Sequence, residues 1–311
     1  MKEKILNQRK ISRIFQTEIV SINRSCKNLI KKYGLRYRTL TLKEKEIIKN
    51  KSLLKIKKDK QKIAKSYRTK IWYNGWQENY EEFKKTKNFN SIVPKYYTRK
   101  KFKTFRLGGK FINTNDPEFE LKMLDIYRNW FLRTYFSKCS NIYEFGAGSG
   151  NNILSASKIF PKKKIYGLDF VKSSVNLINL IGKNRKNIHG KFFDMSKPNN
   201  TFKIRKDSGF FSIGALEQLN NKIDPIINFF LKSKPIICIN IEPDLKYYLP
   251  NKYLEDKIAV KFQNKRGYTS NLFKTLFLLE KKNKIKIIKH FRAPFGSQFI
   301  EGYNFIAWKP K

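Results

Sequence analysis

Residue types that often supply metal ligands or crosslinks are scarce in this 311-residue sequence. It has two histidines, His189 and His290, and three cysteines with no C-x-x-C pair. This supply is too small for the usual zinc motifs, so we expect no metal site. An odd number of widely spaced cysteines also argues against a disulfide framework and favours reduced thiols in the cytoplasm. The cysteines are Cys26, Cys139 and Cys238.

Long apolar runs are missing as well. Charged and polar residues (Arg13, Gln16 and Glu18) interrupt the apolar positions between residues 11 and 22, so we expect no secretory signal peptide. No stretch approaches the roughly 18 apolar residues of a membrane-spanning helix, so we expect no membrane span.

Acidic residues are few, which leaves a large positive charge. Asp and Glu number 24 against 68 Lys and Arg, giving a formal net charge of +44. Such a charge is typical of proteins that bind nucleic acids. Lysine is nevertheless spread along the whole sequence, including residues 281–286, and we favour a general bias toward lysine at solvated positions. The nucleic-acid interpretation stays open beside it.

Composition divides the sequence into three segments. Residues 1–70 are lysine-rich, with a loosely helical spacing of apolar positions, and predict a basic helical N-terminal extension without chemistry. Residues 71–135 are rich in aromatic residues and predict a packed helical cap. This cap is expected to end in a helix over 116–136, which begins at an Asp-Pro start signal. Residues 136–311 predict a separate domain.

Strand and helix patterns alternate in this last segment, which is typical of a parallel sheet covered on both faces. The final two strands are joined by a short connection containing Pro and Gly, and this requires an antiparallel last pair. We therefore predict an α/β fold, a seven-stranded Rossmann-like sheet with an antiparallel last strand. The expected strands cover 141–145, 164–168, 188–193, 208–213, 235–241, 285–291 and 303–308.

The most specific motif lies between Ile142 and Asn152, where the sequence reads I-Y-E-F-G-A-G-S-G-N-N. Apolar residues lead to an acid at a strand end, glycines allow a tight turn, and the free N–H groups of a starting helix face a ligand. The dinucleotide pattern G-x-G-x-x-G would need a third glycine at position 151, which is asparagine, so NAD is excluded. The turn resembles that of class I S-adenosylmethionine (SAM) methyltransferases.

This resemblance implies SAM as the cofactor, with acids at three successive strand ends as its partners. Glu144 would hold the methionine ammonium group, Asp169 the ribose hydroxyls and Asp194 the adenine amino group. The three acids are expected at one edge of the sheet because each ends a parallel strand, and ligands bind at the carboxyl ends of such strands. The full set expected at the cofactor is Glu144, Gly146, Gly148, Gly150, Asn152, Asp169, Phe170, Asp194, Met195 and Leu216.

The fourth and fifth strands point to the acceptor side of the site. The stretch S-I-G-A-L-E-Q (212–218) lacks the N-P-P-Y or D-P-P-Y motif of exocyclic-amine methyltransferases, and no Pro-Cys nucleophile follows. Glu217 and Glu242 end these strands as candidate bases for an acceptor hydroxyl. Each also has a structural interpretation, as a charge at a helix N-terminus or as a turn residue before Pro243, and these alternatives stay open.

A narrower resemblance covers the sequence from Trp72 onward. It is similar to bacterial methyltransferases of polysaccharide and O-antigen synthesis that are described as sugar O-methyltransferases. This implies a saccharide or nucleotide-linked sugar as the small-molecule acceptor. The stretches specific to this narrower group are I-G-A-L-E-Q (213–218) and R-A-P-F-G-S followed by E-G-Y (292–303), with W-Y-N-G-W (72–76), I-E-P (241–243) and K-R-G-Y (265–268) matching as well.

Arginine, carboxylate and aromatic side chains in these stretches suit a sugar ring, and Arg266 or Arg292 would suit a phosphate. We therefore expect Arg266, Arg292, Glu301 and Tyr303 at the acceptor, with Phe295 beside them. An alternative stays open, in which Arg292, Phe295, Glu301 and Tyr303 only stabilise the final hairpin.

Two hypotheses from other classes accompany the sugar methyltransferase. One is an RNA methyltransferase whose basic N-terminal extension holds phosphates, and the other is a non-catalytic partner that keeps the SAM fold. The sequence has no amine-methylation motif and no recognisable RNA-binding module, which favours the sugar hypothesis. No motif specifies an oligomeric state.

Overall fold

The computed structural model describes residues 2–63, 66–98 and 103–311. Its main sheet has seven strands in the order β10-β12-β9-β8-β5-β6-β7. All run in one direction except β12, which is antiparallel to both of its neighbours. The strands are β5 (Asn141–Phe145), β6 (Lys164–Asp169), β7 (Ile188–Phe192), β8 (Ser208–Ile213), β9 (Ile237–Ile241), β10 (Ile285–Phe291) and β12 (Phe305–Pro310).

This sheet confirms the α/β fold expected from the sequence. Counted along the chain from β5, its spatial order is 3-2-1-4-5-7-6 with the last strand reversed, which is the class I methyltransferase architecture. The reversal follows from the chain between β10 and β12, which contains no helix and so cannot make the crossover that a parallel pair requires.

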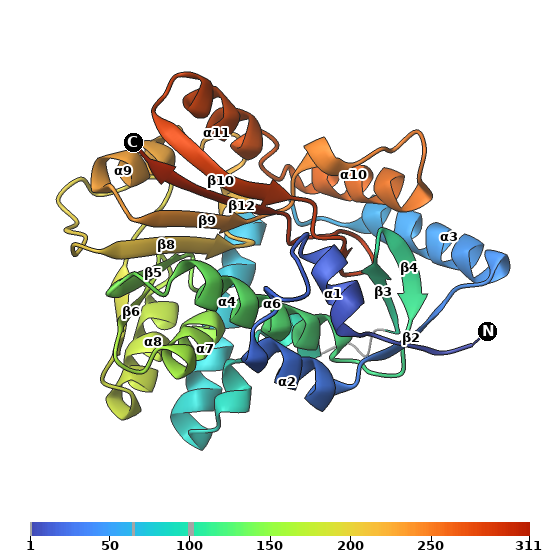
Figure 1. The fold of residues 1–311 in the computed structure, drawn as a ribbon, viewed down its shortest axis with the longest axis horizontal. Coiled ribbons are helices and arrows are strands. Elements are labelled where there is room, and N and C mark those ends of the chain that lie inside the picture. The colour runs from blue at the N-terminus through green and yellow to red at the C-terminus, as the bar shows by residue number, and fades with distance from the viewer. Residues whose placement is uncertain (1, 64–65, 99–102) are drawn as a thin grey trace.

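Helices cover both faces of the sheet (Figure 1). In β5, Ile142 faces one helical layer, whereas Tyr143 and Phe145 face the other, as the two-residue period of a strand requires. The first layer contains α6 (Phe119–Tyr135), α7 (Asn151–Ile159) and α8 (Lys172–Asn184), and the second contains α9 (Asp224–Ser233) and α11 (Leu272–Lys281).

A second, five-stranded sheet was not anticipated from the sequence. Its order is β1-β2-β4-β3-β11, and all of its pairs are antiparallel. The last strand comes from the chain between β10 and β12, which therefore ties the C-terminal domain to the N-terminal part. The strands are β1 (Lys4–Ile5), β2 (Arg36–Thr39), β3 (Thr104–Leu107), β4 (Lys110–Asn113) and β11 (Phe295–Gly296).

The N-terminal segment, predicted as a basic helical extension, packs against the rest of the protein through its first two helices. Helix α1 (Gln8–Ile14) and helix α2 (Arg24–Tyr33) place their apolar side chains in the same core as α6. The Phe15 ring lies 4.8 Å from the Tyr127 ring and 5.1 Å from the Trp130 ring, measured between centroids. The segment is therefore part of the folded unit, because apolar side chains of α1 and α2, among them Ile11, Ile14 and Ile30, are buried in this core.

Three further helices complete the described fold. Helix α3 (Leu42–Lys58) packs against α10 (Leu254–Arg266), and α4 (Ser66–Thr86) packs along α8. The remaining short elements are η1 (Phe89–Ile92), α5 (Lys95–Thr98), η2 (Leu216–Leu219) and η3 (Leu245–Tyr247).

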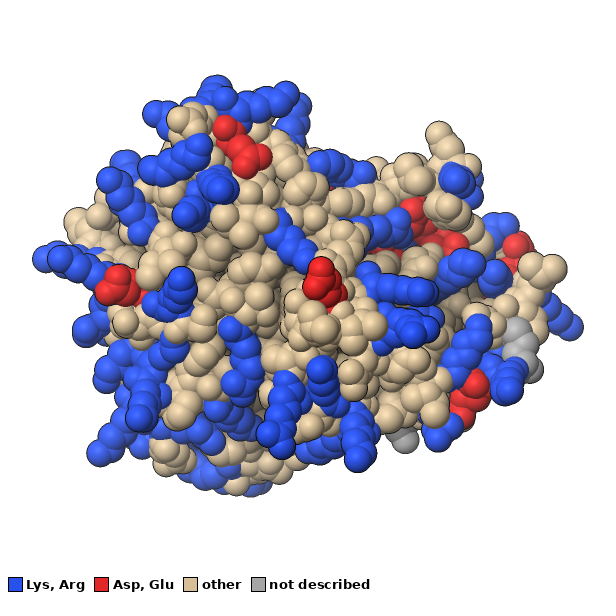
Figure 2. Space-filling model, in the orientation of Figure 1, with Lys and Arg blue, Asp and Glu red and all other residues tan. Residues whose placement is uncertain are grey.

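Basic side chains lie on the surface and the three cysteines are buried. Figure 2 shows lysine and arginine side chains scattered over most of one face and not concentrated in one stripe. Cys26, Cys139 and Cys238 are all buried free thiols. Among the described residues, no helix combines the length and apolar character needed to cross a membrane.

Candidate cofactor and acceptor site

The glycine turn follows β5 at the carboxyl edge of the main sheet. The N–H groups of Gly146 and Ala147 donate to the Leu168 carbonyl at 2.8 and 2.9 Å, which ties the turn to β6. Gly146 has φ +75°, and a Cβ there would lie 2.5 Å from the Ala215 Cβ. Only glycine combines this left-handed backbone with such close packing. The chain then enters α7, for which Gly150 is the N-cap.

Gly148, the middle glycine, lies under an aromatic ring from α4. Its φ is +52°, and a Cβ there would lie 2.7 Å from a ring carbon of Trp76. The Trp76 ring therefore rests on the open side of the turn. Tyr73, one helical turn earlier, meets Phe170 edge to face at 5.9 Å between centroids. Helix α4 thus covers the edge at which the cofactor is expected.

Glu144 ends β5 with one oxygen engaged and one without a partner. Its Oε1 accepts a 2.6 Å hydrogen bond from the Asn152 amide, whose oxygen accepts from Arg128 at 2.8 Å. Arg128 is held in turn by Asp125 at 3.0 Å. Glu144 is fully buried, and among the described residues nothing contacts its Oε2 with a hydrogen bond.

Burial raises the pKa of Glu144 to about 8, opposed by the Asn152 hydrogen bond and by the charge of Arg128. A buried carboxyl with a free oxygen is prepared to meet a cation, which would pull its pKa back down. Asn152, expected at the cofactor, uses both ends of its amide on protein partners in this structure and so acts to position Glu144.

Asp169 ends β6 and joins two pieces of backbone at the same edge. Its two oxygens accept from the N–H groups of Gly148 at 2.8 Å and Val171 at 2.9 Å. The side chain is buried, and desolvation raises its pKa to about 6 although these hydrogen bonds lower it. The Phe170 N–H and the Ser174 hydroxyl also act on this carboxyl group and lower its pKa.

Asp194 and Met195 follow β7. Asp194 accepts from the backbone N–H and hydroxyl of Ser196 at 2.8 and 2.6 Å, which uses only its Oδ1. The Met195 methyl would lie 3.2 Å from a Cβ on Gly146. Residues that are distant in sequence therefore converge on the turn, as the strand-end pattern predicts.

Glu242, one of two candidate bases, is fully engaged by protein groups. Its Oε1 accepts from the Ser212 hydroxyl at 2.8 Å and from the N–H groups of Ala215 and Leu216, and its Oε2 accepts from the Glu217 N–H at 3.2 Å. Desolvation raises its pKa to about 7. Glu242 is 1% exposed and holds the 215–217 backbone in place.

Glu217, the other candidate, accepts a side-chain hydrogen bond from one donor among the described residues. The Gln218 amide donates to its Oε1 at 2.6 Å. Desolvation and the neighbouring Glu242 raise its pKa to about 8, and the charges of Arg68 and Arg266 oppose this rise. Arg266, expected at the acceptor, is therefore near Glu217, although it also pairs with Asp59 at 2.8 Å.

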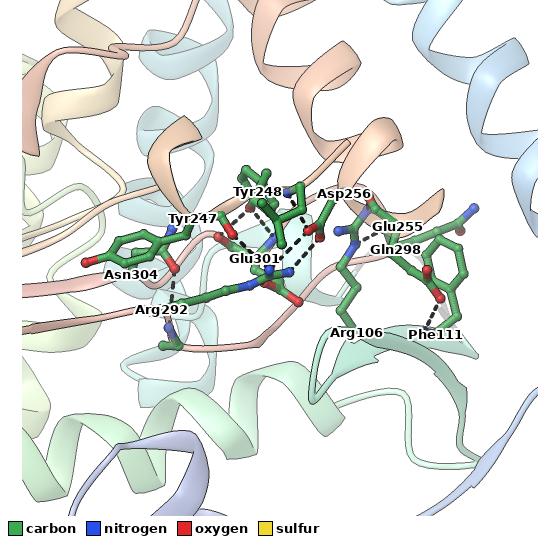
Figure 3. Close-up of polar contacts among 12 residues, drawn as sticks. Arg106, Phe111, Tyr247, Tyr248, Glu255, Asp256, Arg292, Gln298, Glu301 and Asn304 are labelled. Carbon is green, nitrogen blue, oxygen red and sulfur yellow. Dashed lines mark hydrogen bonds and ion pairs between the residues drawn. The ribbon is translucent and has the colours of Figure 1, made fainter. Parts of the chain in front are cut away.

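Arg292 and Glu301 form an internal ion-pair network (Figure 3). Arg292 Nε lies 2.6 Å from Glu301, and its other nitrogens bind Asp256 at 2.6 and 3.1 Å. Glu301 is completely buried. These contacts correspond to the structural alternative raised from the sequence, because both charged groups already have partners of opposite sign.

Tyr303 is also buried, but its hydroxyl bonds to residues outside the ion-pair network of Arg292. Its hydroxyl donates to Glu120 at 3.0 Å and lies 2.9 Å from the Tyr97 hydroxyl. Phe295, expected beside the acceptor, is 1% exposed and stacks on Tyr303 at 4.7 Å. The backbone of Phe295 belongs to β11 and its ring fills the core, which corresponds to the structural alternative raised from the sequence.

Sequence analysis missed the contribution of α4. Arg68, Trp72 and Trp76 recur every four residues, which places them on one side of a helix. The Arg68 guanidinium lies 4.4 Å from the Trp72 ring centroid, and the two tryptophan rings stack at 5.5 Å. The spacing was visible in the sequence, but the expected segment boundary at residue 70 separated Arg68 from the tryptophans.

Comparison with known proteins finds only distant structural likenesses. No protein-family model matches the sequence, and no curated protein matches it. The geranyl diphosphate C-methyltransferase of Streptomyces coelicolor A3(2) aligns with a TM-score of 0.46 at 12% identity, over 64% of this chain and 86% of that chain. The methyltransferase domain of bacterial CtHen1-C gives 0.45 at 15%, over 60% and 96%. A protein from Pyrococcus horikoshii OT3 gives 0.45 at 13%, over 63% and 93%. These likenesses are too distant to indicate what the chain acts on.

Proposed function

We propose that this protein is a SAM-dependent methyltransferase. The observation that carries the proposal is the unpartnered, buried Oε2 of Glu144 beside the glycine turn. Asp169 and Asp194 lie at the next two strand ends, and the hydrogen bonds of Asp194 among the described residues engage only its Oδ1. A ligand with an ammonium group, a pair of hydroxyls and an amino group fits this set of acceptors, and SAM carries all of them.

SAM supplies an activated methyl group when bound. The chain's own residues then have distinct tasks. Glu144, positioned by Asn152 and Arg128, holds the ammonium end. Glu242 holds the Ala215–Glu217 backbone, and Glu217 accepts the proton of the acceptor group. Glu217 suits this role better than Glu242 because one of its oxygens is free of protein donors.

We further propose that the acceptor is a sugar hydroxyl of a saccharide or nucleotide-linked sugar, in polysaccharide biosynthesis in the cytoplasm. Support comes from the resemblance in residues 213–218 and 292–303 and from Arg68 and Arg266, whose charges act on Glu217. In this proposal, residues 1–70 are an N-terminal extension and residues 71–135 are a cap for a methyltransferase domain over 136–311. The packing of α1 and α2 into the core weighs against a free basic arm that grips RNA.

The test is transfer of labelled methyl groups from SAM into a cell lysate by the purified protein, with and without nuclease digestion. We expect label in saccharide or nucleotide-sugar fractions that survives nuclease. The Glu217→Gln variant should lose this transfer and still bind S-adenosylhomocysteine. Label that nuclease removes would establish RNA as the substrate, and a protein that binds the cofactor but transfers nothing to any fraction would support the non-catalytic hypothesis.

A further inference from the structure

The stripe of Arg68, Trp72 and Trp76 on α4 connects the glycine turn with the mouth of β8. Trp76 rests on Gly148, Trp72 stacks on Trp76 with an interplanar angle of 15°, and the guanidinium of Arg68 lies over Trp72. Arg68 Nε then donates to Gln218 at 3.3 Å. One end of the stripe is thus at the expected cofactor and the other is beside Glu217.

Arg68 differs from most buried or half-buried arginines of this protein. It is 7% exposed, and its hydrogen-bond acceptors are the neutral amides of Gln218 and Gln61. Within the described residues, no carboxylate lies at ion-pair distance from it, whereas Arg128, Arg266 and Arg292 each pair with an acid.

Arg106 also lacks an ion pair of this kind, but its surroundings are acidic. It donates to the backbone carbonyls of Gln298 and Glu255, close to the carboxylates of Glu301 and Asp256 (Figure 3). Around Arg68, the nearby Arg266 is neutralised by Asp59. The remaining acid, Glu217, is linked to Arg68 only through the side-chain amide of Gln218, which hydrogen bonds to both. Arg68 therefore has no carboxylate in direct contact among the described residues.

A desolvated cation without a counter-charge costs free energy in the folded state. Burial lowers the pKa of Arg68, but an arginine stays protonated in a protein, so the charge persists. Such an arrangement is stabilised when an anion arrives, and a guanidinium is suited to bind the oxygens of phosphate or carboxylate in pairs.

We propose that Arg68 binds an anionic group of the acceptor, a phosphate or carboxylate attached to the sugar that is methylated. This rests on the proposed function, in which Glu217 accepts the proton of the acceptor hydroxyl. Gln218 joins Arg68 to Glu217 through two hydrogen bonds, so the anionic group and the reacting hydroxyl lie side by side. The acceptor is then a nucleotide-linked or phosphorylated sugar or a uronate, and neutral sugars are poor substrates.

The test measures binding of pyrophosphate, uridine diphosphate and glucuronate to the full-length protein by calorimetry, in the presence of S-adenosylhomocysteine. We expect at least one anion to bind and to bind about tenfold or more weakly to Arg68→Gln, since the charged hydrogen bonds are lost. Arg68→Lys should be intermediate because an ammonium cannot bind two oxygens in one plane. Lys70→Gln, an exposed site on the same helix, is the control for general charge and should stay within about twofold of wild type.

Preference for pyrophosphate and uridine diphosphate identifies a phosphate, and preference for glucuronate identifies a carboxylate. A second variant separates binding from a structural role. Arg68→Met should leave the melting temperature of the ligand-free protein unchanged or raise it, because it removes a buried unpaired charge.

The inference is wrong if none of the three anions binds, if Arg68→Gln binds them as wild type does, or if Arg68→Met is strongly destabilised. Binding of a single-stranded RNA oligomer through Arg68, without binding of the small anions, would also overturn it. S-adenosylhomocysteine binding keeps the two proposals apart. Its loss in the wild type contradicts the methyltransferase, whereas its presence without anion binding contradicts only the role of Arg68.

Discussion

The affinity for S-adenosylhomocysteine should depend on pH through Glu144. Burial raises the pKa of this carboxyl to about 8, so it carries a proton in the free protein at neutral pH. The ammonium group of the ligand, placed against the unpartnered Oε2, favours the carboxylate form. Binding must then expel the proton, and a higher pH must favour binding.

The size of the effect follows from linkage. When binding releases one proton, the dissociation constant falls about tenfold for each unit by which the pH is raised, as long as the pH is below the pKa. This corresponds to about 1.4 kcal/mol of binding free energy per pH unit. For a pKa of about 8, the affinity should rise about tenfold from pH 6 to 7 and about fivefold more to pH 8. Above that, the gain ends because the amino group of the ligand begins to lose its own proton.

Calorimetry in two buffers with different ionisation enthalpies measures the number of protons released, and we expect about one at pH 6.5. Glu144→Gln should bind more weakly and release none. The matched control is Asp244→Asn, which changes another buried carboxyl with a raised pKa, in a cavity of about 400 Å³ beside α11. An affinity that stays flat between pH 6 and 8, or a proton still released by Glu144→Gln, would refute the assignment of Glu144.

Four further outcomes are expected. Gly148→Ala should weaken S-adenosylhomocysteine binding at least about tenfold, because the added Cβ would displace Trp76. Gly108→Ala is the control, since Gly108 has a similar φ of +63° but open space around it, and its binding should not change. Equal effects of the two variants would contradict the Trp76 contact. Glu217→Gln should lower kcat by about a hundredfold or more and remove the rise in rate toward pH 8, and an unchanged pH profile would exclude Glu217 as the base. Deleting residues 2–58 should give insoluble protein, since Phe15 and its neighbours fill the core, and a soluble product with wild-type melting would disprove this. The ligand-free protein should lose stability as pH rises from about 5 to 8, because the folded-state pKa values of Glu144 and Glu217 lie above the ordinary value of 4.5. The melting temperature measured across this pH range tests this, and a melting temperature that rises with pH would contradict the raised pKa values.

Local patterns in the sequence were sufficient for the main sheet and for the cofactor edge. Seven apolar runs with helices between them gave the strands, because burial on both faces of a parallel sheet demands continuous apolar positions. Glu144, Asp169 and Asp194 could be placed together without knowing any contact, since the carboxyl ends of parallel strands share one edge. The glycine turn was recognisable because its backbone tolerates no side chain at Gly146 or Gly148.

The tertiary structure decided how the polar side chains pair, and this depends on residues that are far apart in the sequence. Arg292 is paired with Asp256 and Glu301, and Glu242 is tied to the 215–217 backbone, so neither is free as its position alone suggested. A carboxylate or guanidinium is available to a ligand only when no protein group satisfies it, and no local pattern reports that.

The second sheet and the place of α4 were also decided by tertiary packing. Strand β11 pairs with β3, which lies far from it in sequence, and Trp76 reaches Gly148 from a helix that ends long before the turn begins. In sequence, neither segment carries a pattern that identifies its partner in space. What determined their position was the need of the N-terminal apolar side chains to share one core with α6, since they are too few to bury themselves alone.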